Sequence, residues 1–209
     1  MGRTARRAGR MASAGVIREA ATTLFLSRGY LGTSMEEIAT LAGVSKQTVY
    51  THFADKETLF TDLVRSATDR VDVFVEHLTA VLPDSDDLVA DLRQVARRYL
   101  AQVLQPELLQ LRRLVIGESG RFPELARTYY ERAPERTLAA LASCFGLLAE
   151  RGLLRLDDPG LAAGHFAYLV LGLPLDRAMF CGTDAEPPAD LERHADEAVR
   201  VFLARYGTR

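Results

Sequence analysis

The strongest helix signals of the chain lie in residues 29–60, GYLGTSMEEIATLAGVSKQTVYTHFADKETLF. Ser34, Ser45 and Asp55 each stand where a helix cap is expected, ahead of apolar residues at helical spacing. The Ser-x-x-Glu pattern that begins at Ser34 is a capping box. Gly43 separates the first two of these helices. The stretch therefore predicts two short helices joined by a tight glycine turn, with a third helix packed behind them.

This arrangement is the helix-turn-helix, whose second helix enters the major groove of DNA. Val49 and Phe53 lie four residues apart on that helix and are expected to face the core. Lys46 and Gln47 lie at its N-terminus, where we expect them to contact base edges. The other candidate DNA-binding residues are Thr33, Tyr50, His52 and Lys56, which are expected at phosphate oxygens, and Ser34, Ser45, Thr48 and Thr51.

On charge pattern alone, these polar residues also fit the solvated face of an ordinary helical bundle. The spacing of Gly-Tyr-x-x-Thr, Ile-Ala, Ala-Gly-Val-Ser and Lys-Glu-x-Leu-Phe, however, resembles the DNA-binding signature of the TetR family. The resemblance covers about residues 13–65 and implies a homodimer that binds an inverted-repeat operator, with repression relieved by a small ligand. The family often has Gly at the position of Gln47, so this side chain either adds a base contact or points into solvent.

The rest of the chain is also predicted to be helical, because no stretch shows the sustained alternation of a half-buried strand. We predict an all-α protein of about nine helices, divided into a flexible basic arm at 1–12, a helix-turn-helix domain at 13–60, and a larger helical ligand-binding and dimerisation domain at 61–209. Pro134 and Pro174 lie inside helical patterns and should kink or break them. The expected helices are 13–28, the two of the helix-turn-helix, and about 55–82, 86–104, 107–120, 123–152, 160–181 and 189–206.

The C-terminal part of the chain carries a second resemblance. Residues 108–141, LLQLRRLVIGESGRFPELARTYYERAPERTLAAL, are similar to the C-terminal domain of the AefR-like subgroup. Because kinks leave room between helices, we expect a pocket for a small, mostly apolar ligand. Core packing is the competing interpretation for its aromatic residues. Arg113 either pairs with Glu118 or holds an anionic ligand. The candidate lining residues are Phe74, Tyr99, Leu104, Arg113, Tyr130, Phe145 and Phe166.

The last two predicted helices carry small and apolar residues at helical spacing, which suits a two-fold helical interface. The resemblance implies that these helices from each subunit form a four-helix dimer bundle. Such a dimer would hold two recognition helices about 34 Å apart, one turn of duplex. The candidate interface residues are Ala162, His165, Tyr168, Leu169, Gly172, Ala195, Ala198, Val199, Phe202 and Leu203. His194 is expected at the interface or the surface.

The net charge is −2, yet residues 1–65 hold nine Lys and Arg against six Asp and Glu. A basic segment on an acidic body suits a protein that meets phosphate at one end. The longest apolar stretch, 166–175, is too short to cross a bilayer, and the start lacks a signal-peptide pattern. We therefore expect a cytoplasmic, nucleoid-associated bacterial protein without membrane contact. Cys144 and Cys181 are expected to be reduced thiols, either structural or redox-sensing.

The main rival function is catalysis, for which we find no HExxH, Gly-rich phosphate loop, GxSxG or metal-spaced Cys/His set. We therefore expect no enzyme activity, cofactor or metal. A second rival is a nucleoid-associated DNA-binding adaptor, which binds a protein partner through its helical body and has no inducer. The sequence favours a regulator that binds double-stranded operator DNA as a homodimer and is released by a small ligand.

Overall fold

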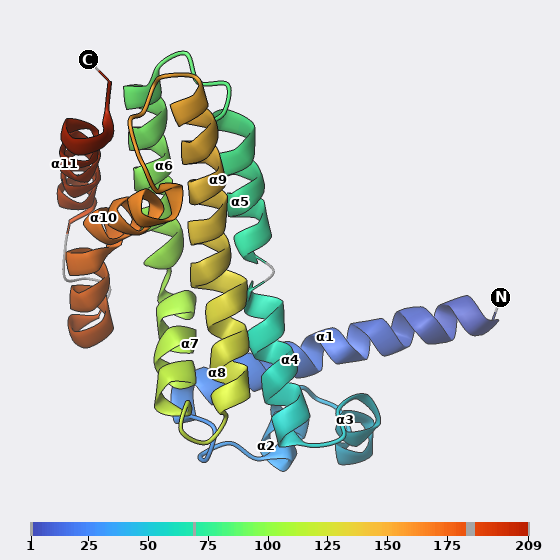
Figure 1. The fold of residues 1–209 in the computed structure, drawn as a ribbon. Helices are drawn as coiled ribbons and strands as arrows, with labels where there is room; N and C mark the ends of the chain where they lie inside the picture. Colours follow the sequence, from blue (N-terminus) through green and yellow to red (C-terminus); the bar gives the residue numbers. More distant parts are fainter. Residues whose placement is uncertain (1, 69, 183–186, 209) are drawn as a thin grey trace. The chain divides into compact units, whose positions relative to one another are not determined.

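The computed structural model describes the backbone of residues 2–68, 70–182 and 187–208, and the side chains of residues 13–68, 71–182 and 187–208 (Figure 1). Its helices are α1 (Gly2–Arg28), α2 (Met35–Leu41), α3 (Lys46–His52), α4 (Lys56–Thr68), α5 (Arg70–Val81), α6 (Leu88–Val103), α7 (Pro106–Gly117), α8 (Pro123–Tyr130), a π-helical turn (Glu131–Glu135), α9 (Arg136–Glu150), α10 (Pro159–Cys181) and α11 (Pro188–Tyr206). The predicted all-α class is confirmed. None of the helices in the described ranges has the length and apolar character that crossing a bilayer requires.

The chain forms two compact units. The first comprises Met1–Ala67 together with Gln110–Tyr129, and the second comprises Thr68–Leu109 together with Tyr130–Arg209. The predicted division at residues 60 and 61 did not foresee that the end of α7 and most of α8 belong with the helix-turn-helix.

Two predicted helix boundaries differ from the structure. α1 begins at Gly2, whereas we predicted a flexible arm up to residue 12. Residues 2–12 contain Ala, Arg and Met, which favour a helix, and no proline to interrupt it. The single helix expected at 55–82 is divided into α4 and α5, and residue 69 between them lies outside the described residues.

The core of the first unit explains why residues 110–129 join it. Tyr30, after α1, lies against Phe60 of α4 with ring centroids 5.2 Å apart. Phe122, in the turn between α7 and α8, contacts both rings, at 4.7 Å from Tyr30 and 5.8 Å from Phe60. Aromatic pairs at these separations add attraction to the area that they bury. The α7–α8 turn is therefore packed onto the residues that support α2 and α3.

The core of the second unit contains a separate aromatic cluster. Phe145 of α9, Phe166 of α10 and Phe202 of α11 are fully buried, with centroids 5.0 to 5.5 Å apart. Cys144 is also buried there, and burial raises the pKa of its thiol. Cys181, at the end of α10, is exposed.

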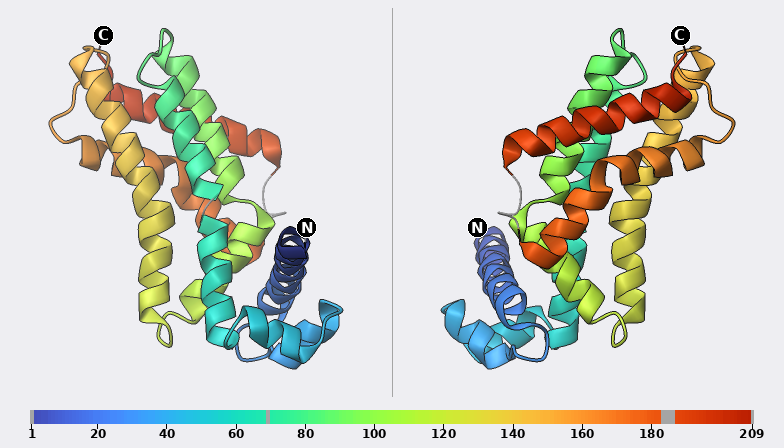
Figure 2. Two further views of the ribbon diagram at one scale, coloured as in Figure 1. Left: turned by 90° about the vertical axis from the view of Figure 1, so that its right-hand side faces the viewer. Right: turned by 90° about the vertical axis from the view of Figure 1, so that its left-hand side faces the viewer.

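Both prolines that lie inside predicted helices affect local structure. Pro134 falls in the π-helical turn between α8 and α9. Pro174 is buried within α10, which continues past it but changes direction along its length (Figure 2). Proline has no N–H for the carbonyl four residues earlier, here that of Val170. The Nε2 atom of His194 on α11 lies 3.1 Å from this carbonyl oxygen and 3.0 Å from that of Leu169. His194, which was expected at the interface or surface, is half-buried and is a partner of the α10 backbone.

Candidate DNA-binding surface and ligand pocket

The helix-turn-helix is held by the caps that its sequence predicts. At the start of α2, the Ser34 hydroxyl accepts from the Glu37 N–H, and the Glu37 carboxylate accepts from the Ser34 N–H at 2.9 Å. Gly43 turns the chain at a φ of +65°, which favours glycine. At the start of α3, the Ser45 hydroxyl accepts from the Thr48 N–H at 3.1 Å. The Ser45 and Thr48 hydroxyls also hydrogen-bond to each other at 2.8 Å.

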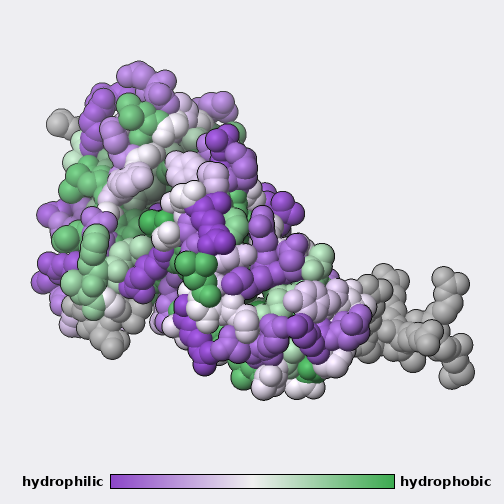
Figure 3. Space-filling model, turned by 90° about the horizontal axis from the view of Figure 1, so that it is seen from below, coloured by the Kyte–Doolittle hydropathy of each residue, from purple (hydrophilic) through white to green (hydrophobic). Residues whose placement is uncertain are grey.

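α3 buries one side and exposes the other. Val49 and Phe53 are buried, as predicted for the inward face. The exposed side carries Ser45, Lys46, Gln47, Tyr50 and Thr51, while Thr48 and His52 are half-buried. Seen from below, the first unit presents mainly hydrophilic residues, with apolar ones in separate patches (Figure 3).

Lys46 and Gln47, the predicted base-reading pair, are both exposed at the start of α3. The Lys46 ammonium forms an ion pair with Glu36 of α2 and lies 5.8 Å from the centre of the Tyr50 ring. The hydrogen bond between the Lys46 ammonium and the Glu36 carboxylate raises the pKa of Lys46 and lowers the pKa of Glu36. Any base contact by Lys46 therefore competes with this ion pair.

Thr33 and Lys56, two of the predicted phosphate contacts, have structural partners within the protein. The Thr33 side chain is 2% exposed, and its hydroxyl donates to the Gly29 carbonyl at 2.9 Å. The Lys56 ammonium donates to the carbonyls of Tyr30 and Thr33 at 2.9 and 2.8 Å, and burial lowers its pKa. These side chains fix the loop that precedes α2, a role that the spacing of the sequence did not reveal.

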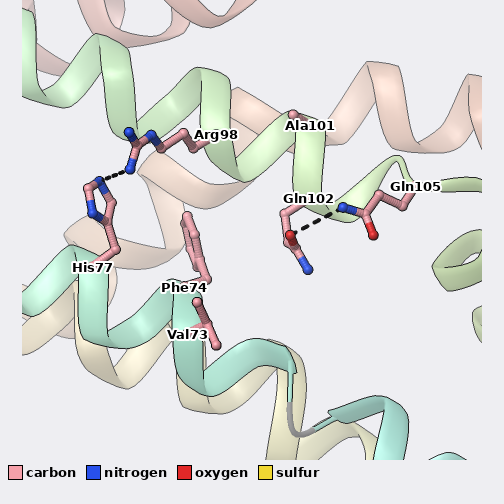
Figure 4. A pocket seen from close by; sticks show the side chains of 7 residues that line it. All are labelled: Val73, Phe74, His77, Arg98, Ala101, Gln102 and Gln105. Carbon is pink, nitrogen blue, oxygen red and sulfur yellow. Dashed lines mark hydrogen bonds between the residues drawn. The ribbon is translucent and has the colours of Figure 1, made fainter.

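A pocket of about 310 Å³ lies between α5 and the C-terminal half of α6 (Figure 4). Its lining residues are Val73, Phe74, His77, Arg98, Ala101, Gln102 and Gln105. Of the seven candidates from the sequence, Phe74 alone is among them. His77, Arg98 and the two glutamines were missed because polar residues on amphipathic helices are ordinarily solvated. No sequence signal indicates that two such faces meet.

The structure does not bring the other six candidates together in this pocket. Tyr99 stacks behind Phe74 at 5.2 Å, Leu104 packs against the second core, and Tyr130 is half-exposed. Arg113 belongs to the first unit. Phe145 and Phe166 are buried in the aromatic core of the second unit. Their placement agrees with core packing, the competing interpretation.

The predicted dimer residues divide into two groups. Half of them are already buried inside the second unit and are unavailable to a partner: Ala162, Ala195, Ala198, Val199 and Phe202. Leu169, Leu203 and Gly172 are half-buried. Tyr168 is 74% exposed. His165 is exposed and shares a 2.6 Å hydrogen bond with the Tyr206 hydroxyl of its own chain. α10 is apolar on every side, so periodicity could not tell its outward face from its inward one.

Comparison with known proteins identifies both parts of the chain. Residues 17–63 match the family model of bacterial regulatory proteins of the tetR family. Residues 90–208 match that of the AefR-like transcriptional repressor, C-terminal domain. The structure is similar to that of a TetR-family transcriptional regulator from Mesorhizobium loti, at 48% identity and a TM-score of 0.88 over 95% of this chain and 98% of that one.

Two further relatives are more distant. The flavonoid-responsive regulator FrrA is 34% identical, with a TM-score of 0.73 over 94% of this chain and 98% of its own. The transcriptional regulator AcrR of Shigella flexneri is 30% identical over 102 residues, 49% of this chain and 45% of AcrR. The aligned part spans from a quarter to less than half of the curated relatives that it matches.

The helix-turn-helix geometry agrees with the family match over residues 17–63, and the match over residues 90–208 covers more than half of the chain. TetR-family regulators bind operator DNA as dimers and often bind small molecules. This chain belongs to the TetR family of bacterial transcriptional regulators.

Proposed function

We propose that this protein is a repressor that binds an inverted-repeat operator as a homodimer and leaves it when a small molecule occupies the second unit. The observation that carries the proposal is the exposed N-terminal turn of α3, which presents Lys46 and Gln47 on a helix whose other side is buried. Since its target is chromosomal DNA, we expect the protein at the nucleoid, in the cytoplasm.

Base reading is assigned to Lys46 and Gln47. Their side chains lie at the end of the helix that enters the groove, where Lys suits guanine and Gln suits adenine. Tyr50, Thr51 and His52 follow on α3 and are proposed to contact phosphates, together with the capping residues Ser34, Ser45 and Thr48.

Regulation by a small molecule is supported by the pocket between α5 and α6 and by the relatives. FrrA, which is similar to this chain over nearly its whole length, is described as flavonoid-responsive. The alternative of an adaptor without an inducer is not favoured, because the relatives include ligand-responsive repressors.

The DNA assignment is tested by selecting bound duplexes from a random pool and measuring affinities for the selected and for unrelated sequences. Lys46→Ala and Gln47→Ala should each reduce the preference for the selected sequence about tenfold or more, since each removes a base pairing. Tyr50→Phe should weaken binding to all duplexes alike. Equal losses on all sequences for all three variants would overturn the base-reading assignment, and indifference to every duplex at low salt would overturn the function.

The Lys56→Ala variant tests whether Lys56 stabilises the protein as well as contributing to DNA binding. Because the Lys56 ammonium holds two backbone carbonyls, its removal should lower thermal stability as well as DNA affinity. Thermal unfolding of this variant without DNA separates the two effects. An unchanged melting temperature together with weaker binding to all duplexes would restore the purely phosphate-binding role.

A further inference from the structure

The pocket between α5 and α6 contains a positive charge that its own lining does not neutralise. The Arg98 guanidinium, from α6, contacts Nε2 of His77 on α5. This is the polar contact that the structure gives Arg98 within the described residues, and none of the pocket's lining residues is Asp or Glu. Arg97, one position earlier on α6, is instead paired with Asp196 of α11 at 2.8 Å. Within the part of the chain that the structure describes, a carboxylate is therefore paired with Arg97 and none with Arg98.

His77 does not supply a second charge in this state. Guanidinium nitrogens only donate, so the His77 Nε2 atom that faces Arg98 acts as the acceptor and carries no proton. Burial, with a contribution from the Arg98 charge, lowers the pKa of His77 and favours the same neutral form at neutral pH. The lining therefore carries one net positive charge, on Arg98.

The rest of the pocket is suited to a flat apolar group. Phe74 is held in place by stacking on Tyr99, with ring centroids 5.2 Å apart and planes at 16°. Val73 lies beside Phe74 on α5 and is 71% exposed. Figure 4 shows these two side chains between the His77–Arg98 pair and the Gln102–Gln105 pair. In the latter, the Gln105 amide donates to the Gln102 amide at 3.4 Å. The pocket therefore has polar ends and an apolar middle.

We infer that this pocket binds a small organic carboxylate, whose charged group contacts Arg98 and whose flat apolar body lies against Phe74 and Val73. Guanidinium and carboxylate form paired, charge-assisted hydrogen bonds, which neutral groups of the same shape cannot match. The volume of about 310 Å³ is near the lower limit for ligand sites, which favours a compact ligand. The inference rests on the proposed function in taking this pocket as the effector site, and it adds the chemical class of the effector.

Calorimetric titration of the full-length protein without DNA tests this assignment, with 1-naphthoate and 1-naphthamide as probes. The two have similar shapes but differ in charge. Naphthoate should bind about tenfold more tightly or better, since it alone offers the guanidinium a charged partner. Arg98→Gln should abolish this preference and leave the affinity for naphthamide unchanged. Arg97→Gln is the matched control: it removes an arginine from the adjacent position outside the pocket, and the preference should remain.

Equal affinities of the two probes, a preference that survives Arg98→Gln, or no binding of either probe at millimolar concentration would each overturn the inference. Thermal unfolding confirms that the variants are folded, and Arg98→Lys, which keeps the charge but loses the paired geometry, should retain part of the preference. Because no DNA is present, the result is independent of operator binding. A protein that binds operator but not naphthoate would contradict this inference alone, and one that binds naphthoate but no duplex would contradict the proposed function alone.

Discussion

At the scale of single residues, Glu36 is the feature of the DNA-binding surface that the sequence did not single out. Its carboxylate holds the ammonium of Lys46, which is a proposed base contact. It also places a negative charge at the surface that must approach phosphates. The ion pair is exposed, so its own contribution to stability is small. Its effect is expected on binding.

Replacement of Glu36 by Gln should therefore increase the affinity for DNA of any sequence by about two- to fivefold at low salt, and less at high salt. Fluorescence anisotropy with a selected and an unrelated duplex measures this change. Glu150→Gln, which removes an exposed carboxylate from the end of α9, serves as the control and should leave affinity unchanged. Weaker binding of the Glu36 variant would show instead that the ion pair orients Lys46 for contact.

At the scale of elements, α10 shows how a proline can be retained inside a long buried helix. Pro174 provides no N–H for the Val170 carbonyl, and a buried carbonyl without a partner is costly. The His194 imidazole from α11 supplies a donor to this carbonyl and to that of Leu169. The same contact links α10 to α11, so we expect the stability of the proline-containing segment of α10 to depend on this side chain of α11.

A double-mutant cycle tests this dependence. His194→Ala should destabilise the protein by about 1 to 3 kcal/mol, because it leaves the Val170 carbonyl without its side-chain donor. Pro174→Ala restores the backbone donor, so His194→Ala should cost about 1 kcal/mol less in that background than in the wild type. Chemical denaturation of the four proteins measures the coupling. Additive effects of the two substitutions would mean that His194 does not act through the proline.

At the scale of the whole molecule, the second unit has exposed apolar side chains on the helices that we predicted to form the dimer. They are Leu161, Tyr168, Leu173 and Phe180 on α10 and Val201 on α11. Phe180 is 89% exposed, which is unusual for a side chain of this size. We therefore propose that the dimer interface consists of these outward residues rather than the buried alanines chosen from the sequence.

Substitution of both Tyr168 and Phe180 by Ser should weaken the dimer about tenfold or more, since large aromatic side chains dominate such interfaces. Analytical ultracentrifugation over a range of concentrations measures the dissociation constant. Leu31→Ser, which removes a side chain that is 71% exposed in the first unit, is the matched control and should leave the dimer intact. An unchanged dissociation constant of the double variant would place the interface elsewhere.

The amino-acid sequence was sufficient to predict the helix-turn-helix, the all-α class and most helix boundaries of the second unit. These depend on local signals: the caps at Ser34 and Ser45, the glycine turn at Gly43, and apolar spacing along each helix. Such signals act within a few residues of each other, so they can be recognised without knowledge of the tertiary fold. The family resemblance that rests on them is confirmed by the two family matches.

The packing of the helices, which the sequence did not reveal, set which side of each helix is covered and which distant residues meet. It brought Phe122 to Tyr30, gave Lys56 and the buried Thr33 a supporting role, and placed His77 opposite Arg98. The tertiary structure was also needed to identify the outward face of α10, because a helix that is apolar all round has no periodicity to indicate its orientation. Contacts between residues far apart in the chain depend on how whole helices pack, and that information is not contained in any local stretch of sequence.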